Sequence, residues 1–184
     1  MFEPTERLWD AIEFAASQHR GQVRKGTGLP YLSHPLGVME LLIDAGAPEP
    51  VVVAGVLHDV LEDTDATSGD LESRFGADVA KLVMDLSEAD KTLSWEDRKR
   101  HTIQDLEGVE GHVLLAACAD KLHNLLSIQA DLAVQGPALW DRFKRGRSQQ
   151  AWYYRELARV FTRRGGEQPL FKRFAALVGE VFPG

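Results

Sequence analysis

The stretch 51–63, VVVAGVLHDVLED, constrains the fold more than any other part of the sequence. It opens with three consecutive valines, a β-branched composition that is also common in strands. The run nevertheless continues well beyond the usual length of a strand, which favours a helix that starts after two prolines and ends near Asp63. Because the sequence holds no convincing run of alternating apolar and polar residues, the chain is predicted to be all-α.

Apolar residues at helical spacing extend over most of the chain. We expect further helices at 5–19, 34–46, 70–75, 77–86, 94–106, 111–132, 138–161 and 170–182. The adjacent glycines Gly165 and Gly166 form the one flexible-looking joint, and the segment after them is too short to be a separate domain. The sequence therefore predicts one compact multi-helix bundle, with a domain over 1–164 and a C-terminal helical tail, 165–184, packed on it.

The 184 residues include 21 basic and 28 acidic side chains, a formal net charge of −7. This balance argues against broad binding of nucleic-acid backbones, whereas a small polyanion needs only a local cluster of cations. No stretch approaches the ~20 apolar residues of a membrane-spanning helix, and the N-terminus lacks the pattern of a secretion signal. Cys118 is the only cysteine and is expected to be an inert, buried thiol. We expect a cytoplasmic protein, and its oligomeric state is left open.

Four polar residues, His58, Asp59, Glu62 and Asp63, occupy one edge of the otherwise apolar helix expected at 51–63. On a continuous helix, residues four apart stack on the same side, so His58 would lie above Glu62 and Asp59 above Asp63. Three carboxylates and an imidazole repel one another and are costly to bury unless a partner is present. A divalent cation bound among these side chains would offset the repulsion and would serve as the missing partner.

Two further candidate ligands lie elsewhere in the chain. His34 opens an expected helix, and Asp120 lies within one of the most apolar segments. Together His34, His58, Asp59 and Asp120 offer two imidazoles and two carboxylates. That mixture suits Mn²⁺, Fe²⁺ or Zn²⁺ and lacks the thiolates of structural zinc sites.

The sequence resembles the HD superfamily of metal-dependent phosphohydrolases, whose signature is a His, a His-Asp pair and a distant Asp. Further motifs are similar to the hydrolase domain of RelA/SpoT-type alarmone enzymes over roughly residues 5–160. These are Arg24-Lys25-Gly26, Pro30-Tyr31, His34-Pro35, Glu62-Asp63 and ADKLHNL at 119–125. Because the chain ends where a bifunctional enzyme would begin its synthetase domain, it most resembles the stand-alone small alarmone hydrolases.

The resemblance implies an HD-type domain over 1–164 that hydrolyses the 3′-pyrophosphate of guanosine 3′,5′-bis(diphosphate), or of the pentaphosphate, with Mn²⁺. It implies that His34, His58, Asp59 and Asp120 bind the metal. It also implies that Glu62 and Asp63 are catalytic and orient or deprotonate the attacking water.

Local cations must offset the net charge of −7 if the ligand is a nucleotide with several phosphates. We expect Arg24, Lys25 and Lys121 to bind the substrate, Arg as a planar fork and Lys as a point charge. Asn124, one turn beyond Asp120, is expected to bind ribose or base. The segment 25–29 is longer than its counterpart in the long bacterial enzymes.

Two other functions remain open: the same chemistry on another nucleotide, and a non-catalytic nucleotide sensor. We expect solvated faces at 98–100 and at 144–147, which are rich in Arg and Lys. The aromatic residues at 152–154 are expected to be core and rim rather than a platform for a base. His19 and His123 either contact the site or pack beside it.

Overall fold

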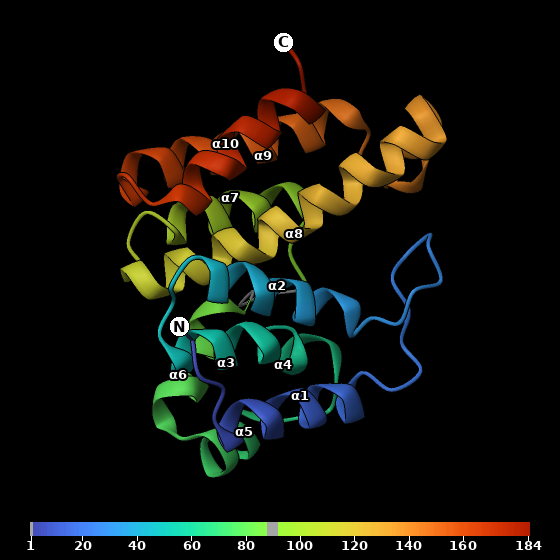
Figure 1. Ribbon diagram of the computed structural model, residues 1–184. Coiled ribbons are helices and arrows are strands. Elements are labelled where there is room, and N and C mark those ends of the chain that lie inside the picture. The colour runs from blue at the N-terminus through green and yellow to red at the C-terminus, as the bar shows by residue number, and fades with distance from the viewer. Residues whose placement is uncertain (1, 88–91) are drawn as a thin grey trace.

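The computed structural model describes residues 2–87 and 92–184, and its regular structure is helical (Figure 1). Within these residues there is no strand, although Val23 and Pro30 form an isolated antiparallel bridge. The all-α prediction is confirmed. The elements are α1 (Glu6–Gln18), α2 (Ser33–Asp44), α3 (Glu49–Leu57), α4 (Val60–Asp63), α5 (Ser68–Phe75), α6 (Ala77–Leu86), α7 (Trp95–Asp105), α8 (Gly111–Gln135), η1 (Gly136–Arg142), α9 (Arg147–Gly165) and α10 (Pro169–Val181).

Helix α8 crosses the middle of the molecule and joins its two halves (Figure 1). On one side α8 packs against α2, α3 and α6, and on the other against α9 and α10. Its side chains from Val113 to Asp120 are buried without interruption. Because α8 is shared, the buried apolar residues of both halves form one core.

Helix α3 is enclosed on all sides from residue 51 onward, which explains why residues 51–57 are all apolar. Every residue from Val51 to Leu57 is buried, and α3 packs against α1, α2, α6 and α8. Gly55 allows a close approach to α2, because a Cβ added there would lie 2.4 Å from Leu42 Cδ1. The two helices therefore bring His34, near the start of α2, close to His58, at the end of α3.

The expected continuous helix through Asp63 is wrong, because the helix is interrupted at His58 and Asp59. Asp59 has φ −92° and ψ −6°, outside the regular helical range. The His58 ring explains the interruption: its Nδ1 lies 2.8 Å from the carbonyl oxygen of Gly55. In an unbroken helix that oxygen would accept the N–H of Asp59. The four polar residues therefore do not lie along one edge of a continuous helix. Their positions are set by the turn at His58 and Asp59.

The expected helix over 138–161 is also wrong, because it consists of two elements with an irregular segment between them. The 3₁₀ helix η1 ends at Arg142, and α9 begins only at Arg147. Phe143 has ψ 132° and Gly146 has ψ −179°, which are extended conformations. Arg145, between them, forms an ion pair with Glu96 on α7 at 2.6 Å. The irregular segment 143–146 therefore packs back toward α7.

The C-terminal helix α10 buries an apolar face against α8 and α9. Gly165 makes room at this junction, since a Cβ there would overlap the ring of Phe171. The boundaries 1–164 and 165–184 stay a prediction. Cys118 is buried as expected, and burial raises the pKa of its thiol. None of the helices among residues 2–87 and 92–184 has the length and apolar character needed to cross a bilayer.

The close contact between α2 and α3 predicts an unusual effect for Gly55→Ala. In a helix Ala is favoured over Gly by ~1 kcal/mol, but here the new methyl group would displace the fully buried Leu42. We expect Gly55→Ala to lower the free energy of unfolding by about 1–3 kcal/mol in chemical denaturation.

Gly179→Ala is the matched control, because Gly179 lies in α10 with nothing within 4 Å of an added Cβ. This variant is expected to be neutral or slightly stabilising. Equal effects at the two glycines would contradict the assigned packing of α2 on α3.

Candidate metal centre and active site

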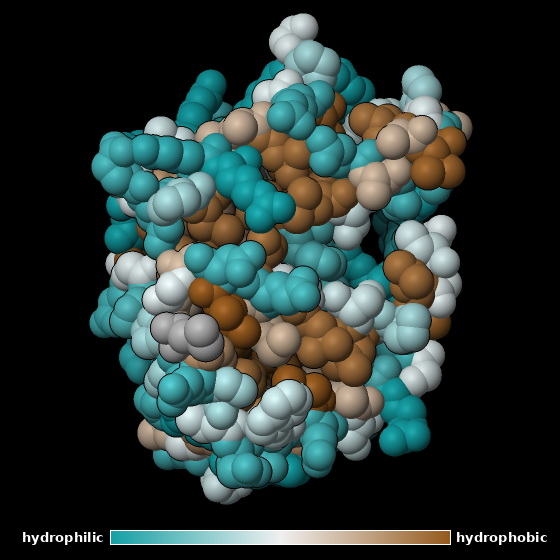
Figure 2. Space-filling model, in the orientation of Figure 1, coloured by the Kyte–Doolittle hydropathy of each residue, from teal (hydrophilic) through white to brown (hydrophobic). Residues whose placement is uncertain are grey.

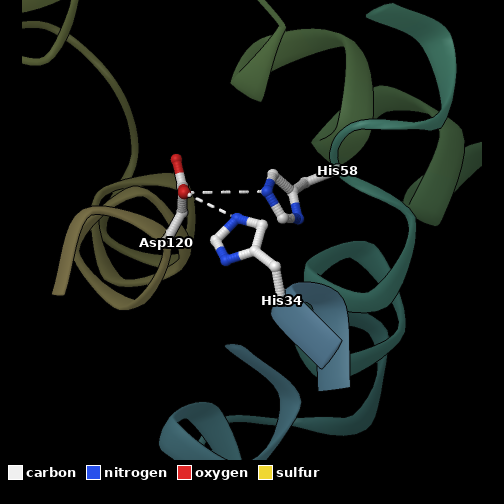
Figure 3. Close-up of side chains that lie close together, drawn as sticks. All are labelled: His34, His58 and Asp120. Atoms are coloured by element: carbon white, nitrogen blue, oxygen red, sulfur yellow. Dashed lines mark ion pairs between the residues drawn. The ribbon is translucent and has the colours of Figure 1, made fainter. Parts of the chain in front are cut away.

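Three side chains from distant segments converge at one point, which Figure 3 shows in close-up. His34 comes from α2, His58 from the end of α3 and Asp120 from α8, and all three are buried. Asp120 Oδ1 lies 3.1 Å from His34 Nε2 and 3.7 Å from His58 Nε2. One ligand atom from each residue lies within 4.8 Å of the others. This His/Asp cluster (His34, His58 and Asp120) is able to bind a metal ion.

Asp59, the fourth expected ligand, lies against the cluster. Its Oδ2 is 3.0 Å from His58 Nε2 and 3.6 Å from His34 Nε2. The hydroxyl of Tyr31 donates a hydrogen bond of 2.5 Å to the same carboxylate oxygen. Tyr31 was not among the expected site residues, although it lies in one of the motifs.

The hydrogen bonding of His58 fits a metal ligand. A carbonyl oxygen only accepts hydrogen bonds, so His58 Nδ1 donates to Gly55 and Nε2 is turned toward the cluster. This Nε2 is buried and makes no well-aligned hydrogen bond among the described residues, although Asp59 Oδ2 lies 3.0 Å from it. A buried nitrogen without a hydrogen bond is costly, and coordination of a cation through its lone pair would remove that cost.

His34 is oriented by a second histidine, His123, which answers a question that the sequence left open. The two Nδ1 atoms lie 2.8 Å apart, so one donates and the other accepts. Burial, with contributions from the neighbouring His34 and from the charge of Arg24, lowers the pKa of His123 to about 4, which leaves a neutral ring. When His123 accepts, His34 carries its proton on Nδ1 and offers the lone pair of Nε2 to a cation.

The His123 ring fits beside α2 because residue 37 is a glycine. A Cβ added to Gly37 would lie 2.1 Å from the Nε2 and Cδ2 atoms of the ring. Sequence reasoning could not find this contact, because His123 and Gly37 lie in different helices.

Two of the residues that were expected to bind substrate hold Asp120, and a third holds one of these two. Lys121 Nζ donates to Oδ2 at 2.6 Å, and Asn124 Nδ2 donates to Oδ1 at 2.7 Å. Arg24 donates in turn to Asn124 Oδ1 at 2.9 Å. Burial opposes ionisation of Asp120, but Lys121 and His34 hold the pKa of this carboxyl well below its usual range. The cluster therefore contains an ionised carboxylate.

The charges of His58 and Asp59 are also coupled. Burial disfavours a charged His58 ring, but Asp59 and Asp120 outweigh this effect and raise its pKa to about 9. Burial likewise opposes ionisation of Asp59, and His58 holds the pKa of that carboxyl below its usual range. The imidazoles thus lie between two ionised carboxylates. The negative electrostatic potential of these carboxylates favours binding of a cation.

The two expected catalytic acids lie in different surroundings. Glu62 is half-buried and lines the same cavity as the His/Asp cluster. Asp63 is exposed, and its Oδ2 lies 3.5 Å from the Tyr31 hydroxyl. Asp63 does not line that cavity, although its backbone carbonyl is fixed by Gln22 Nε2 at 2.8 Å. The structure therefore brings Glu62 to the cluster and leaves Asp63 beside it.

Two adjoining cavities surround the cluster. The smaller, of about 300 Å³, contains the cluster, Asp59 and Glu62. The larger, of about 610 Å³, lies between the loop at 19–32 and helices α7, α8 and α9. Figure 2 shows the surface hollowed where this loop projects beside the C-terminal half. Both cavities are lined by Arg24, Tyr31, Lys99, Lys121 and Asn124.

Helix α7 contributes site residues that the sequence did not reveal. The expected solvated face at 98–100 is wrong for Arg98 and Lys99, which are half-buried and line the smaller cavity. Lys99 Nζ also lies 5.2 Å from the centre of the Tyr153 ring, within the larger cavity. Because α7 buries no residue completely, apolar periodicity could not show which side faces inward. Lys25 is exposed and lines the larger cavity.

Comparison with known proteins agrees with this geometry. A model of the HD-domain family matches residues 11–149. The chain belongs to the HD-domain family. It is 43% identical over 122 residues to guanosine-3′,5′-bis(diphosphate) 3′-pyrophosphohydrolase MESH1 from Mus musculus, covering 65% of this chain and 68% of that protein.

Two solved structures have the same fold as this HD-domain protein. One is lmo0812 from Listeria monocytogenes, with a TM-score of 0.77 and 40% identity over 82% of this chain and 99% of that one. The other is described as a metazoan ortholog of SpoT that hydrolyzes ppGpp, with a TM-score of 0.82 and 30% identity over 98% and 97% of the two chains. The resemblance to RelA/SpoT-type hydrolases that the motifs indicated is confirmed.

The contact between His34 and His123 predicts that His123→Ala weakens metal binding. Loss of an orienting partner of a ligating histidine typically costs ten- to a hundredfold in metal affinity, and we expect a decrease of about that size. The affinity can be measured by competition with a chromophoric chelator.

His112→Ala is the control, because His112 is exposed at the start of α8. Gly37→Ala should reproduce the effect of His123→Ala, since the new methyl group would displace the His123 ring. An unchanged metal affinity in both variants would show that His34 does not depend on His123.

Proposed function

We propose that this HD-domain protein is a metal-dependent pyrophosphohydrolase that removes the 3′-pyrophosphate of guanosine 3′,5′-bis(diphosphate). The products would be GDP and pyrophosphate, or GTP and pyrophosphate from the pentaphosphate. The observation that carries this proposal is a His/Asp cluster that opens into cavities lined by Arg24, Lys99 and Lys121. The similarity to proteins named for this activity supports the same substrate.

The proposed metal ligands are His34, His58, Asp59 and Asp120, and the proposed ion is Mn²⁺. Two imidazoles and two carboxylates suit a borderline or hard divalent cation. Once bound, the ion would lower the pKa of a coordinated water and make hydroxide available near neutral pH.

The chain's own groups supply the remaining chemistry. Glu62, beside the cluster, is proposed to orient the attacking water and accept its proton. Asp63 is proposed to support this step from its position next to Tyr31. Arg24, Lys25 and Lys121 are proposed to bind phosphate oxygens, and Asn124 to contact the nucleotide while it holds Asp120.

The electrostatics of the cavities support a polyanionic substrate. The whole chain has a net charge of −7, yet the larger cavity is lined by five cations and one carboxylate, Asp131, which is paired with Arg142. Such a local excess attracts phosphates that the rest of the surface repels. The proposal includes a cytoplasmic location, where a lone cysteine such as Cys118 stays reduced.

A panel of nucleotides tests the proposed substrate. The purified protein is incubated with Mn²⁺, with Zn²⁺ or with a chelator, and the products are separated by chromatography. We expect pyrophosphate release from guanosine 3′,5′-bis(diphosphate) with Mn²⁺ and none with the chelator. Release of phosphate from a nucleoside mono- or triphosphate would favour another HD phosphohydrolase. Binding of the alarmone without turnover would favour a sensor.

Asp59→Ala and Glu62→Gln should separate metal binding from proton transfer. We expect Asp59→Ala to lose both metal and activity. We expect Glu62→Gln to keep the metal but to lose about 10²–10⁴-fold in kcat, the usual contribution of a general base.

Metal content by atomic spectroscopy and kcat are measured together. Glu72→Gln serves as the control, because Glu72 is exposed on α5 and lines none of the cavities around the cluster. A normal kcat in Glu62→Gln would refute the role assigned to this carboxylate.

A further inference from the structure

A third cavity, of about 350 Å³, lies next to the larger one. It is lined by Lys25, Arg98, Lys144 and Arg145, together with two aromatic rings and one amide. No carboxylate lines it among the described residues, although the chain as a whole has an excess of acidic groups. This composition is that of an anion-binding site.

The third cavity shares four lining residues with the larger cavity and one with the smaller cavity. The four are Lys25, Trp95, Phe143 and Gln150, and none of them lines the cavity of the His/Asp cluster. Arg98 lines both the third cavity and the cavity of the cluster. A nucleoside in the larger cavity would therefore have two cation-lined regions beside it, one of which holds the cluster.

Contacts with two other elements fix the segments that carry cations of the third cavity. Arg145 is fixed by its ion pair with Glu96 on α7. Lys144, next to it, is exposed and forms no ion pair with a described residue. Gly26, at φ +83°, follows Lys25 and lies against Arg142: a Cβ there would be 2.4 Å from its Nε. The loop that carries Lys25 is thus seated on η1, next to the irregular segment 143–146.

Gln150 lies at the boundary of the two cavities. It is only 8% exposed, and its side-chain amide makes no hydrogen bond to another described residue. Because Gln150 lines both the third and the larger cavity, this amide is available to a ligand with polar groups at their boundary.

We propose that the third cavity is a phosphate subsite for the 5′-phosphate chain of the nucleotide, with Gln150 at its junction to the nucleoside. This inference rests on the proposed function, which places the 3′-pyrophosphate at the His/Asp cluster. A bis(diphosphate) carries a second phosphate chain on the other side of the ribose, and Lys25, Lys144 and Arg145 match its charge. The subsite would favour a 5′-di- or triphosphate over a 5′-monophosphate.

The test uses a substrate series that differs only in the 5′ chain: guanosine 3′-diphosphate with a 5′-mono-, di- or triphosphate. Lys144→Ala should raise KM about threefold to tenfold for the 5′-di- and triphosphate, with little change for the 5′-monophosphate and in kcat. Lys144→Arg should restore most of the affinity. Arg100→Ala, which removes an exposed cation of α7 that lines none of the three cavities, should leave all KM values unchanged.

The outcomes separate this subsite from the proposed function. If the wild-type protein turns over the series but Lys144→Ala changes KM for all three substrates equally, or for none, the subsite is wrong and the function stands.

If no member of the series turns over, the proposed function fails, and calorimetry of the chelator-treated protein with inorganic tripolyphosphate decides the subsite alone. Weaker binding to Lys144→Ala than to Arg100→Ala would support a phosphate site. Equal binding to the two variants would overturn it.

Discussion

The close packing of α2 on α3 is the contact on which the site depends. It exists because Gly55 has no side chain where the two helices meet, so that Leu42 can lie against the backbone of α3. The same residue supplies the carbonyl that binds the ring of His58 and interrupts the helix. Position 55 therefore acts in two ways: its missing side chain sets the distance between the helices that carry the two histidines, and its backbone carbonyl orients one of the rings.

Each candidate ligand has a fixed partner outside the cluster. His58 is held by a carbonyl, His34 by His123, Asp59 by Tyr31, and Asp120 by Lys121 and Asn124. Such partners fix the tautomer of an imidazole and the orientation of a carboxylate before an ion arrives, which lowers the entropic cost of binding it. The buried, ionised Asp120 supplies the charge that draws the cation in.

The sequence predicted the fold class and the convergence of His34, His58 and Asp120, because long apolar helices and family motifs carry that information. It did not predict the breaks at His58 and after Arg142, since both follow from contacts with other segments: a side chain on a carbonyl, and an ion pair with Glu96. It also missed Arg98 and Lys99. A polar helix such as α7 shows no apolar stripe, so only its tertiary position reveals which side lines the cavities. Tyr31 and His123 act through contacts far apart in sequence, which no local pattern reports.

The series of bonds from Arg24 through Asn124 to Asp120 has a thermodynamic consequence. A phosphate that draws the Arg24 guanidinium away from Asn124 also changes how firmly Asp120 is held. Linkage is reciprocal, so an ion bound at Asp120 must alter the affinity for that phosphate by the same factor. The fraction of protein with an ion at Asp120 therefore depends on the phosphate concentration, and the fraction with a phosphate at Arg24 depends on the ion concentration.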